Sequence, residues 1–497
     1  MSQAMRIGGP AGTGSLGRKL QEHFGFRRFR PGQARAVQAA IDGRDTIVIM
    51  PTGSSKSVCF QLPALELVGT TVVVSPLIAL MKDQADSLRA RGISVAEVNS
   101  TLRAGEERDA LTAIAEGRME FVYTTPERLA MPAFREILKQ TTIDLFVVDE
   151  AHCASQWGHD FRPEYLSLAD TIAELGRPTV LALTATATPD VIDDIRGQLR
   201  LVAAEVVHMG IDRPNLHVAT VKAEGEAAKR AEILRLVAES EGTGIIYTAT
   251  VKAVKDLTEF LQDQGIAAES YHGQLRVAAR TENQDRFMRG DLKVIVATNA
   301  FGLGIDKPDI RFVVHHHAPA TIEAYYQEAG RAGRDGLPAR CVLLHDPSDR
   351  SLHRFFQAGR YPTGEDLVNA HHALKRLAAE DGSPTFERLR ALSPVPKTRL
   401  KQALNLFKNR GVVREEDAQI QLLVPDLSMI ELHRMAGDYR ERDERDLLKQ
   451  RQMSEFAETR QCRWTYLADY FKVDDDAPAP APAPACGHCD NCDAGLA

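Results

Sequence analysis

The sequence predicts an α/β fold: two parallel-sheet units in tandem, followed by a helical region and a small cysteine-rich module. Three observations carry this prediction. From about residue 20 to residue 347, short β-rich runs alternate with amphipathic helical patterns, as is typical of strands buried in a parallel sheet. After Pro347 the pattern becomes mainly helical. Four of the seven cysteines lie between residues 462 and 492.

The first unit is expected over residues 17–208 and the second over residues 209–347. A Gly- and Ser-rich segment, residues 1–16, is expected to form a flexible leader. The expected strands of the first unit are Thr46–Met50, Thr71–Ser75, Ile143–Asp149 and Thr179–Thr184. Those of the second unit are Gly244–Thr248, Lys293–Thr298, Phe312–His315 and Cys341–His345.

Composition and net charge limit the classes of protein to which this chain can belong. The chain has 497 residues, a formal net charge of −7 and 44% hydrophobic residues, which is typical of globular domains. This excludes a uniformly basic nucleic-acid binder but not a protein with one basic face. No apolar run reaches the length of a membrane span, and the N-terminus lacks the apolar core of a signal peptide. We therefore expect a cytoplasmic protein (nucleoid-associated if bacterial) without a membrane partner.

A phosphate-binding loop is predicted directly after the first strand. Thr46–Met50 leads into Pro-Thr-Gly-Ser-Ser-Lys-Ser, residues 51–57, and then into a helical pattern. In such a strand–loop–helix the backbone of Thr52, Gly53, Ser54 and Ser55 would face the phosphates of ATP, with Lys56 on the β/γ oxygens and Ser57 on Mg²⁺. Ser55 stands where a glycine is usual. A loop disabled by Ser55 therefore remains an alternative.

Two adjacent carboxylates end a second apolar strand. Leu145-Phe-Val-Val-Asp-Glu-Ala-His152 places Asp149 and Glu150 about 90 residues after the phosphate loop. Phosphoryl transfer needs a metal ion and a positioned nucleophile. We expect Asp149 to hold Mg²⁺ through water and Glu150 to orient the attacking water. The alternative is that these two acidic residues only cap the end of a strand. The Lys-Ser pair upstream makes this alternative the weaker one.

The segment Asp149-Glu-Ala-His-Cys-Ala-Ser-Gln-Trp-Gly-His-Asp-Phe-Arg-Pro-Glu-Tyr165 closely resembles the signature of RecQ DNA helicases of superfamily 2. Further segments resemble motifs of the same family in the same order. They are Phe24–Gln33, Val74–Gln84, Tyr123–Arg128, Ala182–Ala187, Val296–Asp306 and Tyr326–Arg334. The resemblance spans residues 20–350 and resumes over residues 450–492. It implies two RecA-like lobes.

The resemblance also implies roles for single residues. Phe26, Arg30 and Gln33 fall in the motif that reads adenine, where a glutamine amide offers a donor and an acceptor together. Arg331 and Arg334, in Gly-Arg-Ala-Gly-Arg, would point at the γ-phosphate, a task that suits the rigid guanidinium fork. Asp306 ends the fifth motif and is assigned to the nucleotide site. These assignments complete the predicted ATP site.

An aromatic-rich loop follows the paired carboxylates. Trp157, His159, Phe161 and Arg162 lie within a few residues of each other, together with Asp160. Aromatic faces stack on unpaired bases, and the charges argue against a core role. By resemblance, this loop couples DNA binding to ATP hydrolysis. We expect Trp157 and Phe161 to touch DNA, with His159 at the same DNA site, and Arg162 or Asp160 to relay the contact.

The C-terminal cysteines predict a structural zinc site. Cys486, Cys489 and Cys492 are spaced as Cys-x-x-Cys-x-x-Cys, and Cys462 offers a fourth thiolate. Four thiolates satisfy tetrahedral Zn²⁺ with no open position; an iron–sulfur cluster is the alternative. The module is expected over residues 436–497, with the Ala-Pro tract 477–485 as an internal loop.

Residues 348–435 resemble a winged helix placed before the zinc module instead of after it. A helix is expected at Phe386–Leu392, a second from Lys397, and a β-like return at Gln419–Val424. Residues 385–414 carry eight basic side chains and one acidic one. Lys397, Lys401 and Lys408 would share one helix face. We interpret this face as a phosphate-contacting surface; a solvated basic face is the alternative.

Together these features predict an ATP-dependent DNA helicase of RecQ type that uses ATP, Mg²⁺ and Zn²⁺. The family implies 3′-to-5′ translocation and work in DNA repair or recombination on single-stranded and forked or branched DNA, with single-strand-binding or repair proteins as partners. Two alternatives stay open: a DNA-stimulated ATPase acting as a translocase or annealing factor, and a DNA-binding platform that does not hydrolyse ATP. An RNA helicase is a weaker alternative, against which the aromatic loop and zinc module argue.

Overall fold

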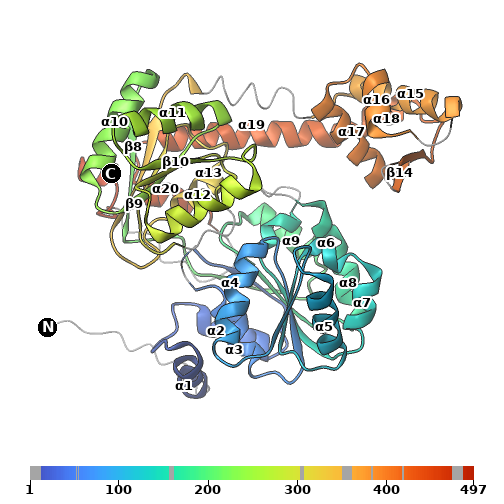
Figure 1. Ribbon diagram of the computed structural model, residues 1–497, viewed down its shortest axis with the longest axis horizontal. Coiled ribbons are helices and arrows are strands. Elements are labelled where there is room, and N and C mark those ends of the chain that lie inside the picture. Colours follow the sequence, from blue (N-terminus) through green and yellow to red (C-terminus); the bar gives the residue numbers. More distant parts are fainter. Residues whose placement is uncertain are drawn as a thin grey trace. The chain divides into compact units, whose positions relative to one another are not determined.

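The computed structural model describes residues 13–51, 53, 55–155, 162–302, 307–349, 361–381, 384–416, 419–472 and 485–496. The chain divides into two compact units (Figure 1). One comprises Met1–Leu344 together with Phe456–Ala497, and the other comprises His345–Glu455. The first unit contains two sheets, which we call lobe 1 (elements from Thr13 to His208) and lobe 2 (elements from Leu216 to His345).

Lobe 1 is built on a seven-stranded sheet in the order β3-β4-β2-β5-β6-β1-β7. Neighbouring strands pair in parallel throughout. Two apolar clusters cover the two faces of this sheet, because alternate side chains of each strand point to opposite faces. The strands are β1 Thr46–Ile49, β2 Thr70–Val74, β3 Val95–Val98, β4 Phe121–Thr124, β5 Ile143–Val148, β6 Thr179–Thr184 and β7 Glu205–His208.

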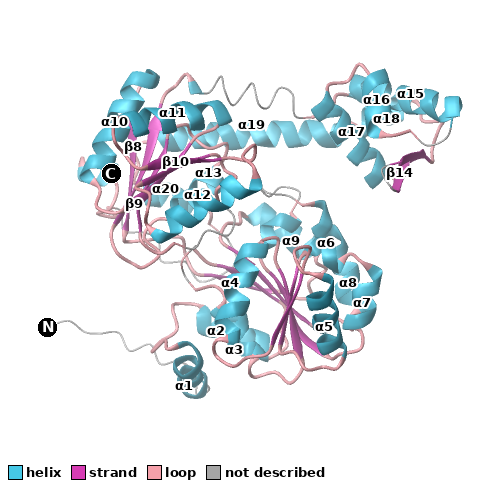
Figure 2. Ribbon diagram, in the orientation of Figure 1, coloured by secondary structure: helices cyan, strands magenta, loops and turns pink. Residues whose placement is uncertain are grey.

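The first two helices of lobe 1 precede β1, and the later ones lie between successive strands of the sheet (Figure 2). They are α1 Thr13–Phe24, α2 Gln33–Ile41, α3 Val58–Ala64, α4 Ile78–Arg89, α5 Ala104–Ala115, α6 Pro126–Leu129, α7 Pro132–Leu138, α8 Leu168–Glu174 and α9 Pro189–Gln198, with the 3-10 turns η1 Ala151–Ala154 and η2 Pro163–Ser167. Helix α1 begins at Thr13, within the segment expected to be a flexible leader. Its Leu16 and Leu20 are buried against Val37, Val58 and Leu62, so apolar packing orders this part of the segment.

Lobe 2 is built on a six-stranded sheet in the order β10-β11-β9-β12-β13-β8. Its strands are β8 Leu216–Lys222, β9 Thr243–Tyr247, β10 Ala268–Tyr271, β11 Val294–Ala297, β12 Ile310–His315 and β13 Ala339–His345. Its helices are α10 Gly225–Glu239, α11 Val251–Asp263, α12 Val277–Arg289 and α13 Ile322–Ala329. The cysteine-rich segment contributes α20 Arg463–Tyr470 and α21 Asp490–Asp493 to the same unit.

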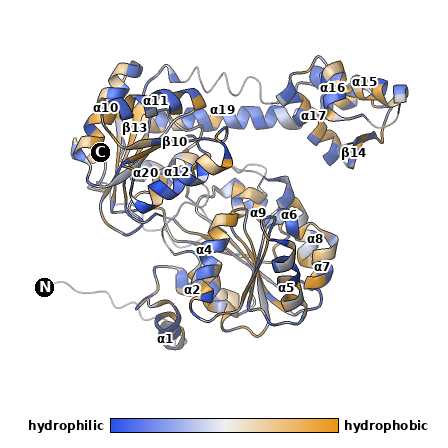
Figure 3. Ribbon diagram, viewed as in Figure 1, coloured by the Kyte–Doolittle hydropathy of each residue, from blue (hydrophilic) through white to orange (hydrophobic). Residues whose placement is uncertain are grey.

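The described residues of the second unit form helices and one antiparallel pair of strands. Its elements are α15 Gly364–Asp381, α16 Phe386–Leu392, α17 Lys397–Asn409, β14 Val413–Glu416, β15 Gln419–Leu422 and α18 Met429–Met435. Strands β14 and β15 pair antiparallel. A core of its own joins these elements. The helix α19 Gly437–Glu458 contributes its residues up to Glu455 to this unit, and Figure 3 shows the helix as largely hydrophilic.

The α/β fold class with two parallel-sheet lobes and a helical C-terminal region is confirmed. All eight strands expected from the sequence are present, with bounds that shift by one or two residues. Strands β3, β4, β7, β8 and β10 were not expected. Among the described residues, no helix is both long and apolar enough to cross a membrane.

Candidate nucleotide site and cysteine cluster

The predicted phosphate loop lies between β1 and α3. Ser57 is the N-terminal cap residue of α3, and its carbonyl accepts the backbone N–H of Gln61 at 2.8 Å. Gly53 and Ser55 both have positive φ, 75° and 57°. Ser55 therefore keeps the left-handed backbone that a glycine adopts freely, at a cost of about 1 kcal/mol to an L residue. Thr52 and Ser54 lie outside the described residues.

The paired carboxylates lie beside this loop. The amine of Lys56 is 3.7 Å from Oε1 of Glu150, and both side chains are largely buried. Glu150 has a φ of 46°, rare for a residue with a side chain. Its Oε2 is buried and accepts no hydrogen bond within the described parts of the chain. A lysine from the loop after β1 and a carboxylate from the C-terminal end of β5 thus meet beyond the C-terminal ends of the strands.

Asp149 is held from three sides. Its Oδ2 accepts a hydrogen bond from the Ser75 hydroxyl at 3.2 Å, and its Oδ1 accepts the Glu150 backbone N–H at 3.0 Å. The Tyr165 hydroxyl donates to the Asp149 carbonyl at 3.1 Å. Burial, with the charge of Glu150, raises the pKa of Asp149 to about 6. A buried carboxylate with a raised pKa is typical of a functional site.

His152 links the carboxylates to the end of β6. Its Nδ1 lies 3.0 Å from the Thr184 hydroxyl and 3.4 Å from Oε2 of Glu150. The Thr184 hydroxyl in turn donates to the carbonyl of Thr186 at 3.1 Å. The sequence motif Ala182–Ala187 is therefore connected to the motif that begins at Asp149. Neither Ser75 nor His152 was predicted as a site residue, although both lie within the motifs that were quoted.

The predicted adenine-reading residues contact the same loop. The Arg30 guanidinium donates from Nη1 to the Gly53 carbonyl at 3.0 Å. Gln33 is 3% exposed; its Oε1 accepts the Arg30 backbone N–H at 2.8 Å, and its Nε2 donates to the Ser55 carbonyl at 3.3 Å. Phe26 is 44% exposed. The structure thus joins Arg30 and Gln33 to the phosphate loop, while an adenine contact stays a prediction.

The two predicted arginines of lobe 2 follow α13. Arg331 is 5% exposed and lies beside the hydroxyl of Tyr247, which donates to the Phe301 carbonyl at 2.7 Å. Arg334 is partly buried. Asp306 lies outside the described residues.

Arg213 and Asn215 hold the loop that carries these arginines. Arg213 donates from Nη2 to the carbonyls of Ala332 and Gly333 at 3.1 and 2.9 Å. Asn215 donates to the carbonyls of Gly333 and Leu337 at 2.8 and 3.0 Å. Sequence reasoning missed both residues, because single polar residues in a connecting segment carry no periodic or motif signal.

Most of the predicted DNA-contacting loop cannot be placed. Trp157, His159 and Phe161 lie outside the described residues, as does Asp160. Arg162 is described: it is partly buried, and its backbone N–H donates to the Cys153 carbonyl at 3.0 Å.

In the second unit, the predicted lysine face belongs to α17. Leu400, Ala403, Leu404 and Phe407 are buried and form the face of α17 that packs into the core of this unit. Lys397 and Lys401 are exposed, and the Lys401 amine lies 5.7 Å from the centre of the Phe386 ring. Lys408 is half-buried and forms an ion pair with Glu415 of β14. Lys408 is therefore less available to a phosphate than the other two lysines.

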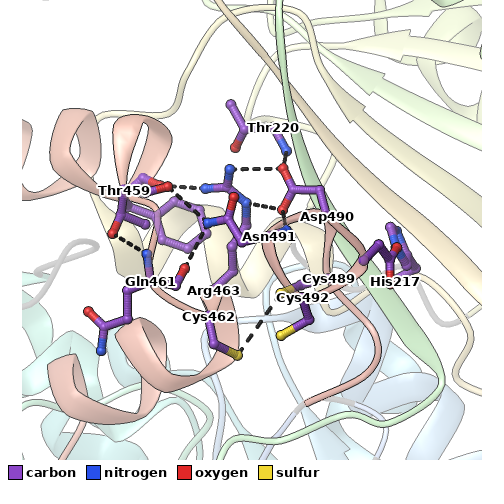
Figure 4. A network of polar contacts seen from close by, with 12 residues as sticks. His217, Thr220, Thr459, Gln461, Cys462, Arg463, Cys489, Asp490, Asn491 and Cys492 are labelled. Atoms are coloured by element: carbon purple, nitrogen blue, oxygen red, sulfur yellow. Dashed lines mark hydrogen bonds and ion pairs between the residues drawn. The ribbon is translucent and has the colours of Figure 1, made fainter. Parts of the chain in front are cut away.

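The four C-terminal cysteines converge, and Figure 4 labels three of them, Cys462, Cys489 and Cys492. The Sγ atoms of these three and of Cys486 all lie within 4.8 Å of one another. The Sγ atoms of Cys486 and Cys492 are 3.6 Å apart, and those of Cys462 and Cys489 are 4.0 Å apart. Sulfur atoms at 2.3 Å from a tetrahedral zinc ion are about 3.8 Å apart. The cluster therefore fits Zn²⁺ bound by four thiolates.

Asp490 anchors the cysteine cluster to lobe 2. It receives two hydrogen bonds from the guanidinium of Arg463, at 2.5 and 2.9 Å, and the backbone N–H of Thr220 in β8 at 2.9 Å. The side chain of Arg463 is almost fully buried. Nearby, the amide of Asn491 donates to the carbonyls of Thr459 and Gln461. Short helices and loops that have little core of their own are thereby fixed to a sheet.

Three family models match the chain in order. They are a DEAD/DEAH box helicase domain over residues 30–195, a helicase conserved C-terminal domain over residues 228–336 and a RecQ zinc-binding domain over residues 427–493. The two-lobed fold, the phosphate loop beside two carboxylates and the matched family models thus define a helicase of the phosphate-loop class.

Relatives narrow this class to one family. The chain is 34% identical to the ATP-dependent DNA helicase RecQ of Synechocystis over 96% of its own length and 98% of that protein. It is 42% identical to the probable ATP-dependent DNA helicase RecS of Bacillus subtilis, over 74% of each chain. The chain belongs to the RecQ family of ATP-dependent DNA helicases.

Other relatives extend beyond the match. The chain is 46% identical to the RecQ helicase of Bacillus subtilis over 68% of its own length, but the match covers 57% of that relative. Among solved structures, the helicase Lhr of Mycobacterium smegmatis bound to single-stranded DNA and AMP-PNP aligns with a TM-score of 0.53, at 23% identity, over 82% of this chain and 60% of that one. Dbp5 of S. cerevisiae bound to RNA and ADP BeF3 aligns with a TM-score of 0.54, at 19% identity, over 69% of this chain and 90% of that one. These structures share the fold.

Proposed function

We propose that this protein is an ATP-dependent DNA helicase of RecQ type that couples ATP hydrolysis to 3′-to-5′ translocation and unwinding of duplex DNA in repair or recombination. One observation carries the enzymatic part: the amine of Lys56 and the carboxylate of Glu150 meet at 3.7 Å beside the buried Asp149. A lysine, a metal-binding carboxylate and a second carboxylate able to orient water are the groups that phosphoryl transfer requires.

In this proposal each group has one task. Lys56 binds the β/γ-phosphates, and Ser57 with Asp149 holds Mg²⁺, which neutralises developing charge when it is bound. Glu150 orients the attacking water through its Oε2, which accepts no hydrogen bond from the described residues. Arg331 and Arg334 stabilise charge on the γ-phosphate, on a loop that Arg213 and Asn215 hold by its carbonyls. Thr52, Gly53, Ser54, Ser55, Phe26, Arg30, Gln33 and Asp306 complete the nucleotide site.

DNA contacts are proposed for the aromatic loop and for the second unit. Trp157, His159, Phe161 and Arg162 would contact or relay contact with an unpaired strand, and Lys397 and Lys401 would bind phosphates, with Lys408 contributing less because of Glu415. Phosphate contacts carry no base information. We therefore expect selectivity for DNA structure, such as single strands and forks, rather than for sequence. Zn²⁺ in the four-cysteine cluster would be structural.

ATP hydrolysis tests the enzymatic part of the proposal. Lys56→Ala and Glu150→Gln should each lower DNA-stimulated ATP hydrolysis by at least about 100-fold while DNA binding is retained. Glu174→Gln, which removes an exposed carboxylate at the end of α8, should hydrolyse ATP as the wild type does. Robust hydrolysis by Glu150→Gln would contradict the assigned site.

DNA coupling and polarity need separate measurements. Trp157→Ala should leave basal ATP hydrolysis intact but remove most of its stimulation by single-stranded DNA, because a stacking platform is worth about 1–3 kcal/mol per base. Duplexes with only a 3′ or only a 5′ single-stranded tail test polarity. We expect unwinding of the 3′-tailed duplex alone; the opposite preference would overturn the proposed polarity.

A translocase or annealing factor is the second candidate. The second unit, His345–Glu455, stands in the chain between lobe 2 and the cysteine cluster and has a core of its own. In this candidate the second unit does not engage the duplex where its strands would separate. DNA-stimulated ATP hydrolysis without unwinding of any tailed duplex would favour this candidate.

A further inference from the structure

Three consecutive histidines lie at the end of β12: His315 is its last residue, and His316 and His317 follow it. The Nε2 of His315 lies 2.9 Å from Oε2 of Glu328, and its ring stacks on Tyr247 with ring centres 5.6 Å apart. His316 and His317 turn instead toward Glu226, in the first turn of α10. Glu226, His316 and His317, which we call the second cluster, all belong to lobe 2.

The second cluster brings one ligand atom from each residue within 4.8 Å of the others. The Nε2 of His316 lies 3.2 Å from Oε2 of Glu226. The Nδ1 atoms of His316 and His317 face each other at 3.0 Å. The backbone N–H of Ala249, just after β9, points at the His317 Nδ1 at 3.4 Å. The end of β12, the segment after β9 and the start of α10 therefore meet at these rings.

His316 is buried with one ring nitrogen that the described residues do not satisfy. Its ring is 1% exposed, and its Nε2 has no hydrogen-bond partner of adequate geometry within the described part of the chain. A buried imidazole nitrogen without a partner is costly. Two ring nitrogens facing each other across 3.0 Å also cannot both present lone pairs. Either a proton or a metal ion must lie among these groups.

We propose that Glu226, His316 and His317 form a second divalent-metal site, specific for a borderline transition-metal ion such as Zn²⁺, Ni²⁺ or Co²⁺. Two imidazoles and one carboxylate suit these ions, whereas Mg²⁺ and Ca²⁺ prefer oxygen ligands alone. The Nε2 of His316, which lies 3.2 Å from Oε2 of Glu226 and has no hydrogen-bond partner among the described residues, is the nitrogen of that ring that faces the carboxylate and would bind the ion. Three protein ligands leave a position for water.

The two histidines and the glutamate differ in access. The Glu226 side chain is 62% exposed, whereas His316 is buried. An ion can therefore enter from solvent through Glu226 and reach imidazole nitrogens that are already positioned. Its effect would be to tie the start of α10 to the end of β12, which stabilises lobe 2. This site is separate from the four-cysteine cluster and shares no residue with the proposed nucleotide site.

Metal content of the full chain tests the proposal. Tag-free protein is equilibrated with zinc at buffered micromolar concentration, and zinc is counted by mass spectrometry of the element. We expect about two ions per wild-type chain, one in the four-cysteine cluster and one here. Glu226→Gln and His317→Asn should each hold about one. Glu224→Gln is the matched control: it removes a neighbouring exposed carboxylate that pairs with Lys222, and it should hold about two.

Cobalt identifies which site loses its ion. Co²⁺ bound by thiolates has an intense sulfur-to-metal absorption, and Co²⁺ bound by nitrogen and oxygen lacks it. Glu226→Gln should lose only the weaker visible Co²⁺ bands of the nitrogen–oxygen site, while the sulfur-to-metal band and the visible bands of the four-cysteine site remain. One zinc ion per wild-type chain, or two that persist in both variants, would overturn the proposal and leave a shared proton as the occupant. Binding that appears only at millimolar metal would overturn it as well. Neither outcome depends on helicase activity.

Discussion

Gly333, in the loop that carries the two proposed γ-phosphate arginines, can tolerate no side chain. Its φ is 55°. A Cβ at this position would lie 2.5 Å from the Asn215 Nδ2 and 2.8 Å from the Leu337 carbonyl oxygen, which is 0.9 and 0.6 Å short of ordinary contact at 3.4 Å. Gly333→Ala must therefore displace the loop or break the two hydrogen bonds that Asn215 donates.

Gly336, three residues further along, is a matched control. Its φ is 84°, and a Cβ there would meet nothing within 4 Å. Both alanine variants pay about 1–2 kcal/mol for a left-handed backbone, but only Gly333→Ala adds the collision. A misplacement near 1 Å in a catalytic group costs about 100-fold in rate. We expect ATP hydrolysis to fall about 10- to 100-fold in Gly333→Ala and by less than about twofold in Gly336→Ala.

The assay is DNA-stimulated ATP hydrolysis, with single-stranded DNA binding and thermal unfolding measured on the same samples. Comparable unfolding temperatures for the two variants would show that both are folded. If Gly333→Ala then hydrolysed ATP as fast as Gly336→Ala, the loop of Arg331 and Arg334 would not need its observed position. The proposed role of these arginines would fall with that result.

Two further predictions concern the phosphate loop and the cysteine module. Ser55→Gly removes a serine whose backbone is left-handed, with φ 57°. Because about 1 kcal/mol of backbone strain is relieved, this variant should bind ATP as tightly as the wild type or up to about fivefold more tightly. Weaker ATP binding, measured by calorimetry, would show that the serine hydroxyl is needed. Asp490→Ala strands the buried Arg463 and should destabilise the cysteine module by about 3 kcal/mol, seen as a lower unfolding temperature. Asp493→Ala, which removes an exposed partner of His217, should cost at most about 1 kcal/mol, and equal losses in the two variants would contradict the anchoring role of Asp490.

How far the sequence predicts this structure depends on the kind of signal. The eight expected strands are apolar runs bounded by turn residues, and such runs are buried between two layers of helices. Strand β10, Ala268-Glu-Ser-Tyr271, lies at a sheet edge with only Ala268 fully buried. An edge strand needs no continuous apolar run, so its sequence gave no signal. The same holds for β3, which includes the half-buried Glu97.

The candidate sites likewise combine residues that sequence motifs predict and residues that only the tertiary structure brings into place. Cys462 is distant in sequence from Cys486, Cys489 and Cys492, yet ligand count and spacing placed all four together, and the structure confirms that they converge. Lys56 and Glu150 are likewise brought together from a loop and a strand end. Arg213, in contrast, acts through its own guanidinium on backbone carbonyls of a distant loop. Such a contact depends on tertiary structure and leaves no local pattern.

Single-turnover unwinding of a forked duplex with a 3′ tail, with ATP consumption followed in the same reaction, tests the central claim most directly. The proposal predicts that wild-type protein separates the strands only while it hydrolyses ATP, and that Glu150→Gln binds the fork and ATP but does neither. Strand separation by Glu150→Gln at the wild-type rate, or ATP hydrolysis by the wild type with no unwinding of any fork, would contradict it.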